Sequence, residues 1–193
     1  MIYIHPKTQA LIFDCDGTIA DSMIIHNNAW NTIAQRYKLQ ITTEQIAHYN
    51  GIPTLQILQR LTEGHGYEYD LSLIVEEKEK LAQKDIHRVL PIKPVVDIIE
   101  KYHRKLPMVV ISGGASENVY KTLEALNLID YFEFIITADD DHPTKESPEA
   151  FLQIAKRLGV KAQQCHVFED GKPGLINAIK ADMVVTDIRT FYP

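Results

Sequence analysis

Two aspartates, two residues apart, follow a short apolar segment near the start of the chain. Residues 10–13 are apolar throughout, and Asp14 and Asp16 come directly after them. Such a run predicts a buried strand, and in extended backbone residues i and i+2 point to the same side, so both carboxylates can face one small volume. Gly17 lets the backbone turn away sharply, and Thr18 adds a hydroxyl at that turn. Because two close carboxylates repel each other unless a cation or a shared proton relieves them, we expect one to act as an ionised nucleophile and the other as a proton donor and acceptor.

From about residue 94 onward, the sequence alternates between helix-like and strand-like periodicity. Apolar runs predict strands at 108–111, 134–137, 165–168 and 183–186. Predicted helices lie at 94–104, around Val119 and Leu123 after a cap at Ser116, from Pro148 to Leu158 between Ser147 and Gly159, and at 173–181. This alternation is typical of the α/β fold class, with a parallel sheet and helices on both faces.

Residues 22–88 interrupt that series with helical periodicity and no convincing strand. Thr43 and Thr54 offer N-caps for two short helices, and Ser72 precedes a longer one. The segment is too long for a simple strand-to-helix connection, where one crossover helix would suffice. We therefore predict an α/β core made of residues 1–21 and 89–193, and an inserted helical cap made of residues 22–88, with 90–94 as the return linker.

The composition excludes several classes of partner. The chain has 193 residues, a formal net charge of −6 and no run of five or more basic residues, which argues against nucleic acid. No apolar run of 18 or more residues and no signal-like N-terminus occur, so we expect a cytoplasmic protein without a membrane partner. The sequence does not fix the oligomeric state, for which a monomer is our working expectation. A disulfide between Cys15 and Cys165 is possible, but their apolar surroundings favour reduced, buried thiols.

Other predicted strands also end in polar side chains. Ser112 follows one strand, and Glu169 and Asp170 follow another, while Lys145 lies in the loop before the helix capped by Ser147. Ligands of open α/β sheets bind beyond the carboxyl ends of the strands, where these residues would meet Asp14. Taken singly, a serine and two glycines after a strand are more often an ordinary turn, and a lone lysine beside a helix start is usually a solvated charge.

Together and in this order, these elements resemble the four motifs of the haloacid dehalogenase (HAD) superfamily of phosphotransferases. Residues 14–18 resemble its D-x-D-G-T signature, and residues 145–151 resemble K-P-x-P-D-x-F, with Glu146 and Glu149 as departures. The resemblance implies a Rossmann-like core with a C1-type helical cap.

The resemblance also implies residue roles and a cofactor. Asp14 would be the nucleophile and Asp16 the acid and base, while Ser112, Gly113 and Lys145 would hold the phosphoryl group. An Mg²⁺ ion would be held by the Asp14 carboxylate, the Asp16 backbone carbonyl and Asp170, with Glu169 acting through water. The family usually has Ser or Thr where this chain has Gly171, a departure that could loosen the metal loop.

Residues 21–30 and 50–54 resemble the cap of the β-phosphoglucomutase-like subgroup, and within it the bacterial fructose-1-phosphate phosphatases. By this resemblance His26 would lie near Asp16 and link it to cap closure, and Gly51 would face the substrate. Taken alone, a helix histidine is usually packed or solvated. Lys78 could reach the substrate, although a surface position is the more ordinary reading of such a lysine.

The expected function is hydrolysis of a small sugar monophosphate, with a sugar phosphomutase as the alternative. Thr54 stands where the mutases carry a cap arginine, and Gly114-Ala115 where they carry serine-lysine, so the grip on a second phosphate is missing. Asp16 argues against dehalogenation, and a purely binding or regulatory protein would not need both Asp16 and a cap. Neither G-x-G-x-x-G nor G-x-x-x-x-G-K-[ST] occurs, which argues against a dinucleotide or P-loop site.

Overall fold

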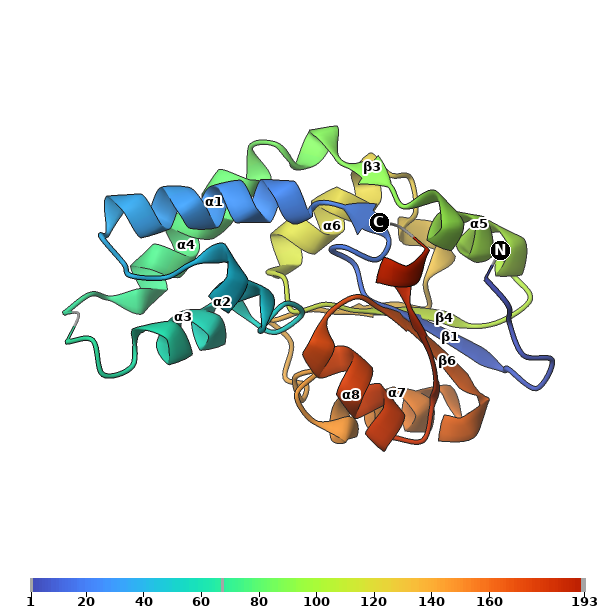
Figure 1. Cartoon of the computed structure of the whole chain (residues 1–193). Helices are drawn as coiled ribbons and strands as arrows, with labels where there is room; N and C mark the ends of the chain where they lie inside the picture. The colour runs from blue at the N-terminus through green and yellow to red at the C-terminus, as the bar shows by residue number, and fades with distance from the viewer. Residues whose placement is uncertain (1, 67, 192–193) are drawn as a thin grey trace.

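A five-stranded parallel sheet forms the centre of the computed structural model, which describes residues 2–66 and 68–191 (Figure 1). Its strand order is β5-β4-β1-β6-β7, so the strand that carries the aspartate pair is the middle one. The strands are β1 (Ala10–Phe13), β4 (Met108–Ile111), β5 (Phe134–Ile136), β6 (Cys165–Glu169) and β7 (Val184–Asp187). The predicted α/β fold class is confirmed, and the strand bounds differ from the predicted ones by one residue at most.

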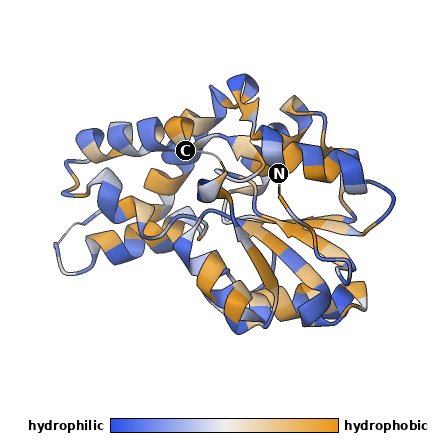
Figure 2. Cartoon of the chain, turned by 45° about the vertical axis from the view of Figure 1, so that its right-hand side comes forward, coloured by the Kyte–Doolittle hydropathy of each residue, from blue (hydrophilic) through white to orange (hydrophobic). Residues whose placement is uncertain are grey.

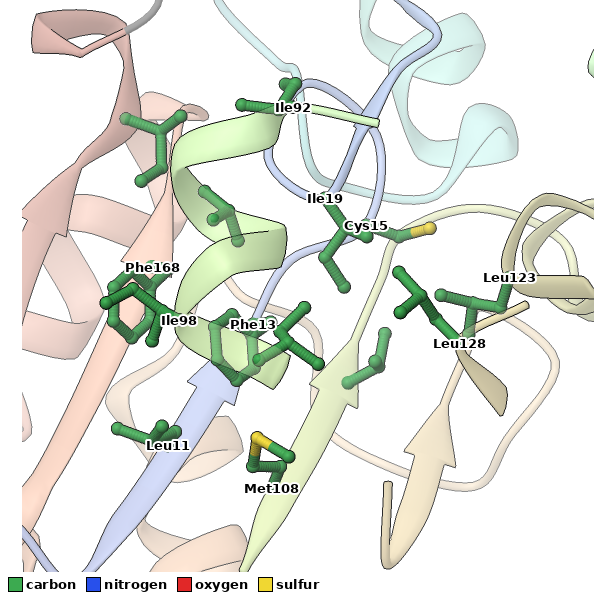
Figure 3. Packing of buried hydrophobic residues seen from close by; sticks show 14 of the residues in the cluster. Leu11, Phe13, Cys15, Ile19, Ile92, Ile98, Met108, Leu123, Leu128 and Phe168 are labelled. Carbon is green, nitrogen blue, oxygen red and sulfur yellow. The ribbon is translucent and has the colours of Figure 1, made fainter. Parts of the chain in front are cut away.

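Helices cover both faces of this sheet, because alternate strand residues point to opposite sides. Leu11 and Phe13 of β1 pack with α5 (Lys93–Tyr102) and α6 (Ser116–Ala125), as Figure 3 shows for part of this cluster. The intervening residue Ile12 packs with α7 (Pro148–Leu158), and α8 (Lys172–Lys180) lies on the same side. A strand buried on both faces is apolar throughout instead of alternating; Figure 2 shows this hydropathy in the sheet.

Four helices lie to one side of the sheet, over residues 22–88 (Figure 1). They are α1 (Met23–Arg36), α2 (Thr43–Ala47), α3 (Thr54–Thr62) and α4 (Leu71–Gln83), followed by the short 3₁₀ turn η1 (Ile86–Arg88). These helices have an apolar cluster of their own, centred on Trp30, Ile33, Leu58 and Ile74. The division into a core and a movable cap remains a prediction, and below "the cap" denotes residues 22–88.

The predicted N-cap residue is confirmed at α7 and is wrong at α2, α3 and α6, while α4 begins one residue before the predicted Ser72. The Ser147 hydroxyl accepts a hydrogen bond from the Glu149 backbone N–H at 3.2 Å, and Gly159 ends α7 with φ +68°, both as predicted. Thr42, not Thr43, caps α2 through a reciprocal capping box with Gln45. The caps of α3, α4 and α6 are Pro53, Asp70 and Ala115, so Thr54, Ser72 and Ser116 lie inside their helices.

Two short strands that the sequence did not reveal join the cap to the core. β2 (Ala20–Asp21) pairs antiparallel with β3 (Leu90–Pro91), and the partners are Ala20 with Pro91 and Asp21 with Leu90. This ribbon ties the outgoing linker to the return linker predicted at residues 90–94. Two-residue strands carry too little periodicity to be predicted from sequence.

Both cysteines are buried and free, as predicted. Among residues 2–66 and 68–191, no helix is long and apolar enough to cross a membrane.

Candidate active site

The carboxyl ends of β1 and β6 bring three acidic residues together. Phe13 is the register partner of Phe168, and the Asp14 backbone N–H donates to the Phe168 carbonyl at 3.0 Å. Asp14 therefore lies beside Glu169, which the structure makes the last residue of β6, and beside Asp170, which follows it.

Lys145 neutralises part of this acidic group. Its Nζ donates to Asp14 Oδ1 and, at 2.8 Å, to Glu169 Oε2, and the residue is only 2% exposed. Burial alone would lower the pKa of Lys145, but the two carboxylates raise it above its ordinary value. Unlike a typical lone lysine beside a helix start, Lys145 is thus buried against two carboxylates, one of which belongs to Asp14.

The loop that carries Lys145 is held by a residue that the sequence did not single out. Asn177 Nδ2 on α8 donates to the Lys145 carbonyl at 3.1 Å and to the Pro173 carbonyl at 3.0 Å. This amide fixes the lysine backbone against the start of α8. The two residues lie 32 positions apart, and no local pattern joins them.

The acidic cluster has the donor set of a divalent-cation site. Carboxylate oxygens of Asp14, Glu169 and Asp170 lie within 4.8 Å of one another. Burial raises the pKa of Asp14 and that of Asp170, the latter to about 7, and the charge of Glu169 raises both further. Three carboxylates against one lysine leave a negative excess, and Mg²⁺ prefers oxygen ligands of this kind. The residues present thus fit the expected cation.

Asp170 approaches the aspartate loop because of Gly17. This glycine has φ +81°, and a Cβ built on it would lie 2.5 Å from Asp170 Oδ2. Any side chain here would meet strain and a collision. Thr18 Oγ1 also donates to Asp170 Oδ1 at 3.2 Å, so the turn after Asp16 holds a third member of the cluster.

Asp16 lies in a second network, which is separate from Lys145. Ser22 Oγ donates to its Oδ1 at 2.5 Å, and His26 Nε2 lies 3.1 Å from the same oxygen. Burial would raise the pKa of Asp16, but His26 and Ser22 lower it below its ordinary value. In this arrangement the carboxylate is ionised, so it must take up a proton before it can act as an acid.

Lys78 extends this network from α1 to α4 of the cap. Its Nζ lies 3.1 Å from His26 Nδ1 and 2.9 Å from Glu79 Oε1. An ammonium can only donate, so His26 Nδ1 accepts and its Nε2 carries the hydrogen directed at Asp16. Lys78 is 4% exposed, so the surface position favoured for it from sequence is wrong.

Glu79 and Asn118 are further members that the sequence reasoning missed. Thr54 Oγ1 donates to Glu79 Oε1 at 2.6 Å, and Asn118 Nδ2 of α6 donates to Glu79 Oε2 at 2.6 Å. Burial would raise the pKa of Glu79, but Lys78 and Thr54 lower it below its ordinary value. The link from Glu79 to Asn118 joins cap to core across 39 positions of sequence, which explains why no local signal revealed it.

Between the two networks lies a cavity of about 60 Å³. Ser112 follows β4 and is buried, and its Oγ accepts from the Gly114 backbone N–H at 3.0 Å. Gly113 follows on the same wall. The lining residues include Asp14, Asp16, His26, Asn27, Trp30, Gly51, Thr54, Lys78, Ser112 and Gly113. The predicted site residues Glu169, Asp170 and Lys145 lie beside this cavity, around Asp14, and do not line it.

The cap turn at Asn50 and Gly51 closes over the site. Gly51 has φ +90°, and a Cβ at this position would lie 3.1 Å from Lys145 Nζ. A Cβ at Gly171 would lie 2.5 Å from the Asn50 carbonyl oxygen. Gly171, where the family usually has Ser or Thr, therefore leaves room for the cap turn to pack against the loop after Asp170.

Comparison with known proteins agrees with this geometry. The sequence profile of the haloacid dehalogenase-like hydrolases matches residues 11–188. The chain is 33% identical over 186 residues to fructose-1-phosphate phosphatase YqaB of Escherichia coli, covering 96% of this chain and 99% of that protein. It is 25% identical over 186 residues to 6-phosphogluconate phosphatase of Escherichia coli, covering 93% of this chain and 81% of the relative.

Among solved structures, a β-phosphoglucomutase of Clostridium difficile is 28% identical and superimposes with a TM-score of 0.76. The match covers 92% of this chain and 83% of the mutase. The subgroup that residues 21–30 and 50–54 indicated is thus supported by both sequence and fold.

Proposed function

This chain belongs to the haloacid dehalogenase-like hydrolases, and from that membership we propose that it hydrolyses a small sugar monophosphate through a phosphoryl group carried by Asp14. The observation that carries the proposal is the pair of separate networks around one cavity. Asp14 contacts Lys145, whereas Asp16 contacts His26 and Ser22. Different surroundings give two neighbouring carboxylates different roles.

The reaction proceeds in two steps. An Asp14 carboxylate oxygen bonds to phosphorus as the bond to the sugar oxygen breaks, and Asp16 in its protonated form supplies the proton to that oxygen. Asp16 then takes a proton from a water molecule whose oxygen bonds to phosphorus. The bond from phosphorus to Asp14 breaks, inorganic phosphate leaves, and both aspartates return to their starting state.

We expect the phosphoryl oxygens to be held by Lys145, which contacts Asp14, and by two donors that line the same cavity as Asp14. Lys145 supplies a compact positive charge, while the Ser112 hydroxyl and the Gly113 backbone N–H supply hydrogen bonds. Lys145 and Ser112 are buried, so they need little reorganisation during the reaction.

The Asp14 and Asp170 carboxylates and the Asp16 backbone carbonyl are the proposed Mg²⁺ ligands, with Glu169 acting through water. When bound, the cation supplies positive charge against the phosphate oxygens and orients the substrate. The support is the negative excess of the acidic cluster.

Substrate entry requires movement of residues 22–88. A cavity of about 60 Å³ holds a few water molecules, whereas pockets for small ligands are roughly 300–1,000 Å³. We place the hinge at the β2–β3 ribbon, which joins both linkers. Residues 1–21 and 89–193 are the proposed core, and residues 22–88 the proposed cap.

The relatives support a sugar phosphate such as fructose 1-phosphate as substrate. A phosphomutase is the second candidate, favoured by the fold shared with β-phosphoglucomutase. Thr54, where the mutases carry an arginine, offers no charge for a second phosphate and donates instead to Glu79. We therefore propose the hydrolase, acting as a cytoplasmic monomer.

The test is phosphate release from a panel of sugar monophosphates, with and without Mg²⁺. We expect magnesium-dependent release that falls at least about 1,000-fold in Asp14→Asn, and not in the exposed-loop control Asp141→Asn. Conversion of β-glucose 1-phosphate in the presence of a trace of bisphosphate, without free phosphate, would establish the mutase instead.

A further inference from the structure

The cap side of the cavity carries one full positive charge. Lys78 is the only Lys or Arg among the described residues that line the cavity. Its ammonium lies 3.1 Å from His26 Nδ1, so it is within one imidazole ring of Asp16. An unpaired lysine at this place would attract a negative group on the sugar or alcohol part of the phosphate ester.

Glu79 cancels this charge. Its Oε1 accepts from Lys78 Nζ at 2.9 Å, and the two side chains are 13% and 5% exposed. Side chains of consecutive helix residues normally point in different directions. The Glu79 carboxylate therefore needs hydrogen bonds from other elements to stay beside Lys78. Thr54 and Asn118 provide it with hydrogen bonds of 2.6 Å to the two carboxylate oxygens of Glu79.

Among the described cap residues that line the cavity, no other Lys or Arg could replace Lys78, and His26 is already directed at Asp16. Apolar side chains from α1, α2, α3 and the turn before α3 make up half of the rest of this cap wall, namely Met23, Trp30, Ile46, Ile52 and Ile57. Asn27 and Asn50 add neutral amides. Amides and apolar faces suit the hydroxyls and C–H groups of a polyol, whereas a carboxylate or second phosphate placed here would lose its hydration without gaining a counter-charge.

We propose, building on the phosphatase function above, that Glu79 is a specificity-determining residue that restricts the substrate to a phosphate monoester whose remainder is uncharged. By neutralising Lys78, it leaves the cap without a counter-charge for a carboxylate or a second phosphate, so such a group would lose its hydration uncompensated. Specificity of this kind depends on leaving the charge of a wrong substrate unpaired as much as on attractive contacts to the right one. Because Asn118 belongs to the core, the discrimination acts when cap and core are in contact.

The first measurement needs no variant. Steady-state kinetics compare matched pairs of phosphate esters in which a terminal alcohol or aldehyde is replaced by a carboxylate, such as glycerol 3-phosphate with 3-phosphoglycerate and glucose 6-phosphate with 6-phosphogluconate. We expect kcat/KM to be at least about 10-fold higher for the uncharged member of each hydrolysed pair. Equal values, or a preference for the acids, would overturn the proposal.

The decisive variant is Glu79→Gln, which keeps size and shape but leaves Lys78 uncompensated. We expect the ratio of kcat/KM for acid over uncharged substrate to rise about 10-fold to 100-fold, mainly through a lower KM for the acid, and to shrink again at high salt. An unchanged ratio in a variant that still hydrolyses the uncharged esters would contradict the proposal.

Two further proteins isolate the cause. Glu76→Gln removes the same charge from the outer face of α4, where Glu76 pairs with exposed Lys80, and should leave the ratio unchanged. The double variant Lys78→Gln/Glu79→Gln should lose the gain seen in Glu79→Gln, since the gain requires the free ammonium. A gain that persists in the double variant would refute the proposal.

Absence of phosphate release from every ester by the native protein is a different result, because it would refute the proposed function itself.

Discussion

The site contains two buried lysines whose surroundings differ in one respect. Lys145 contacts Asp14 and Glu169, and all three residues belong to the sheet and its loops. Lys78 contacts Glu79 within the cap and reaches the core through His26 and Asp16. Under the proposed function, the half of the site that handles phosphate is assembled by the proposed core alone, whereas the half that meets the rest of the substrate is complete only when the proposed cap and core touch.

The largest effect is expected from Lys145→Met. It leaves Asp14 and Glu169 as buried, uncompensated carboxylates, so we expect about 3–5 kcal/mol less unfolding free energy and at least about 1,000-fold lower kcat. Denaturant unfolding measures the free energy of unfolding, and the rate of phosphate release measures kcat. The exposed control Lys156→Met should change neither, and a normal kcat in Lys145→Met would break the assignment of the phosphate-handling half to Lys145.

Removal of Mg²⁺ should lower the thermal stability of the protein, because the carboxylates of Asp14, Glu169 and Asp170 then repel one another. At about 100 times its dissociation constant, Mg²⁺ should stabilise the protein by about 2.7 kcal/mol, which corresponds to a rise in Tm of about 5–10 °C. Calorimetry with EDTA and with Mg²⁺ measures the shift. Asp170→Asn should lose it, whereas Asp141→Asn should keep it; a shift that survives in Asp170→Asn would place the cation elsewhere.

Asn118→Ala tests the half that depends on cap contact. Removing the donor to Glu79 should cost about 1–3 kcal/mol of unfolding free energy and raise KM about 3-fold to 10-fold, with a smaller change in kcat. Glu124→Ala, an exposed position on the same helix, is the control. If kcat fell as steeply as in Lys145→Met, the two halves would not be separable.

The smallest effect is expected at the outer rim of the cap. Arg60 of α3 pairs with both carboxylate oxygens of Glu146, next to Lys145, and the Arg60 side chain is 40% exposed. Such a pair contributes at most about 1 kcal/mol, so Arg60→Ala should change Tm by a few degrees and KM less than about 3-fold. High salt should abolish the difference from the native protein. A larger change in KM would show that this rim contact also controls cap opening.

Much of the core could be predicted because its signals are local. The apolar run at 10–13 and the cap residue Ser147 lead to a strand and a helix through contacts within a few residues. Parallel strands then bring their carboxyl ends to one edge, which is why Asp14 and Asp170 could be expected together.

The contacts between cap and core could not be predicted in the same way. Glu79 is one of several acidic residues on α4, and its sequence neighbours do not distinguish it from Glu76, yet one is buried against Lys78 and Asn118 and the other is exposed beside Lys80. The β2–β3 ribbon was missed for the same reason, since its partners are about 70 residues apart.

The sequence by itself determined the family and the order of strands and helices, and it placed Asp14, Asp16 and Lys145 at the ends of strands or in loops. Periodicity and turn chemistry act over a few residues, and the motif residues depend on them. Only the tertiary structure decided that Lys78 is buried, that Glu79 cancels its charge and that Gly171 leaves room for the cap turn. Those outcomes depend on how the apolar cluster of the cap helices packs against the core. Packing between segments that are distant in sequence leaves no pattern within the sequence of either segment.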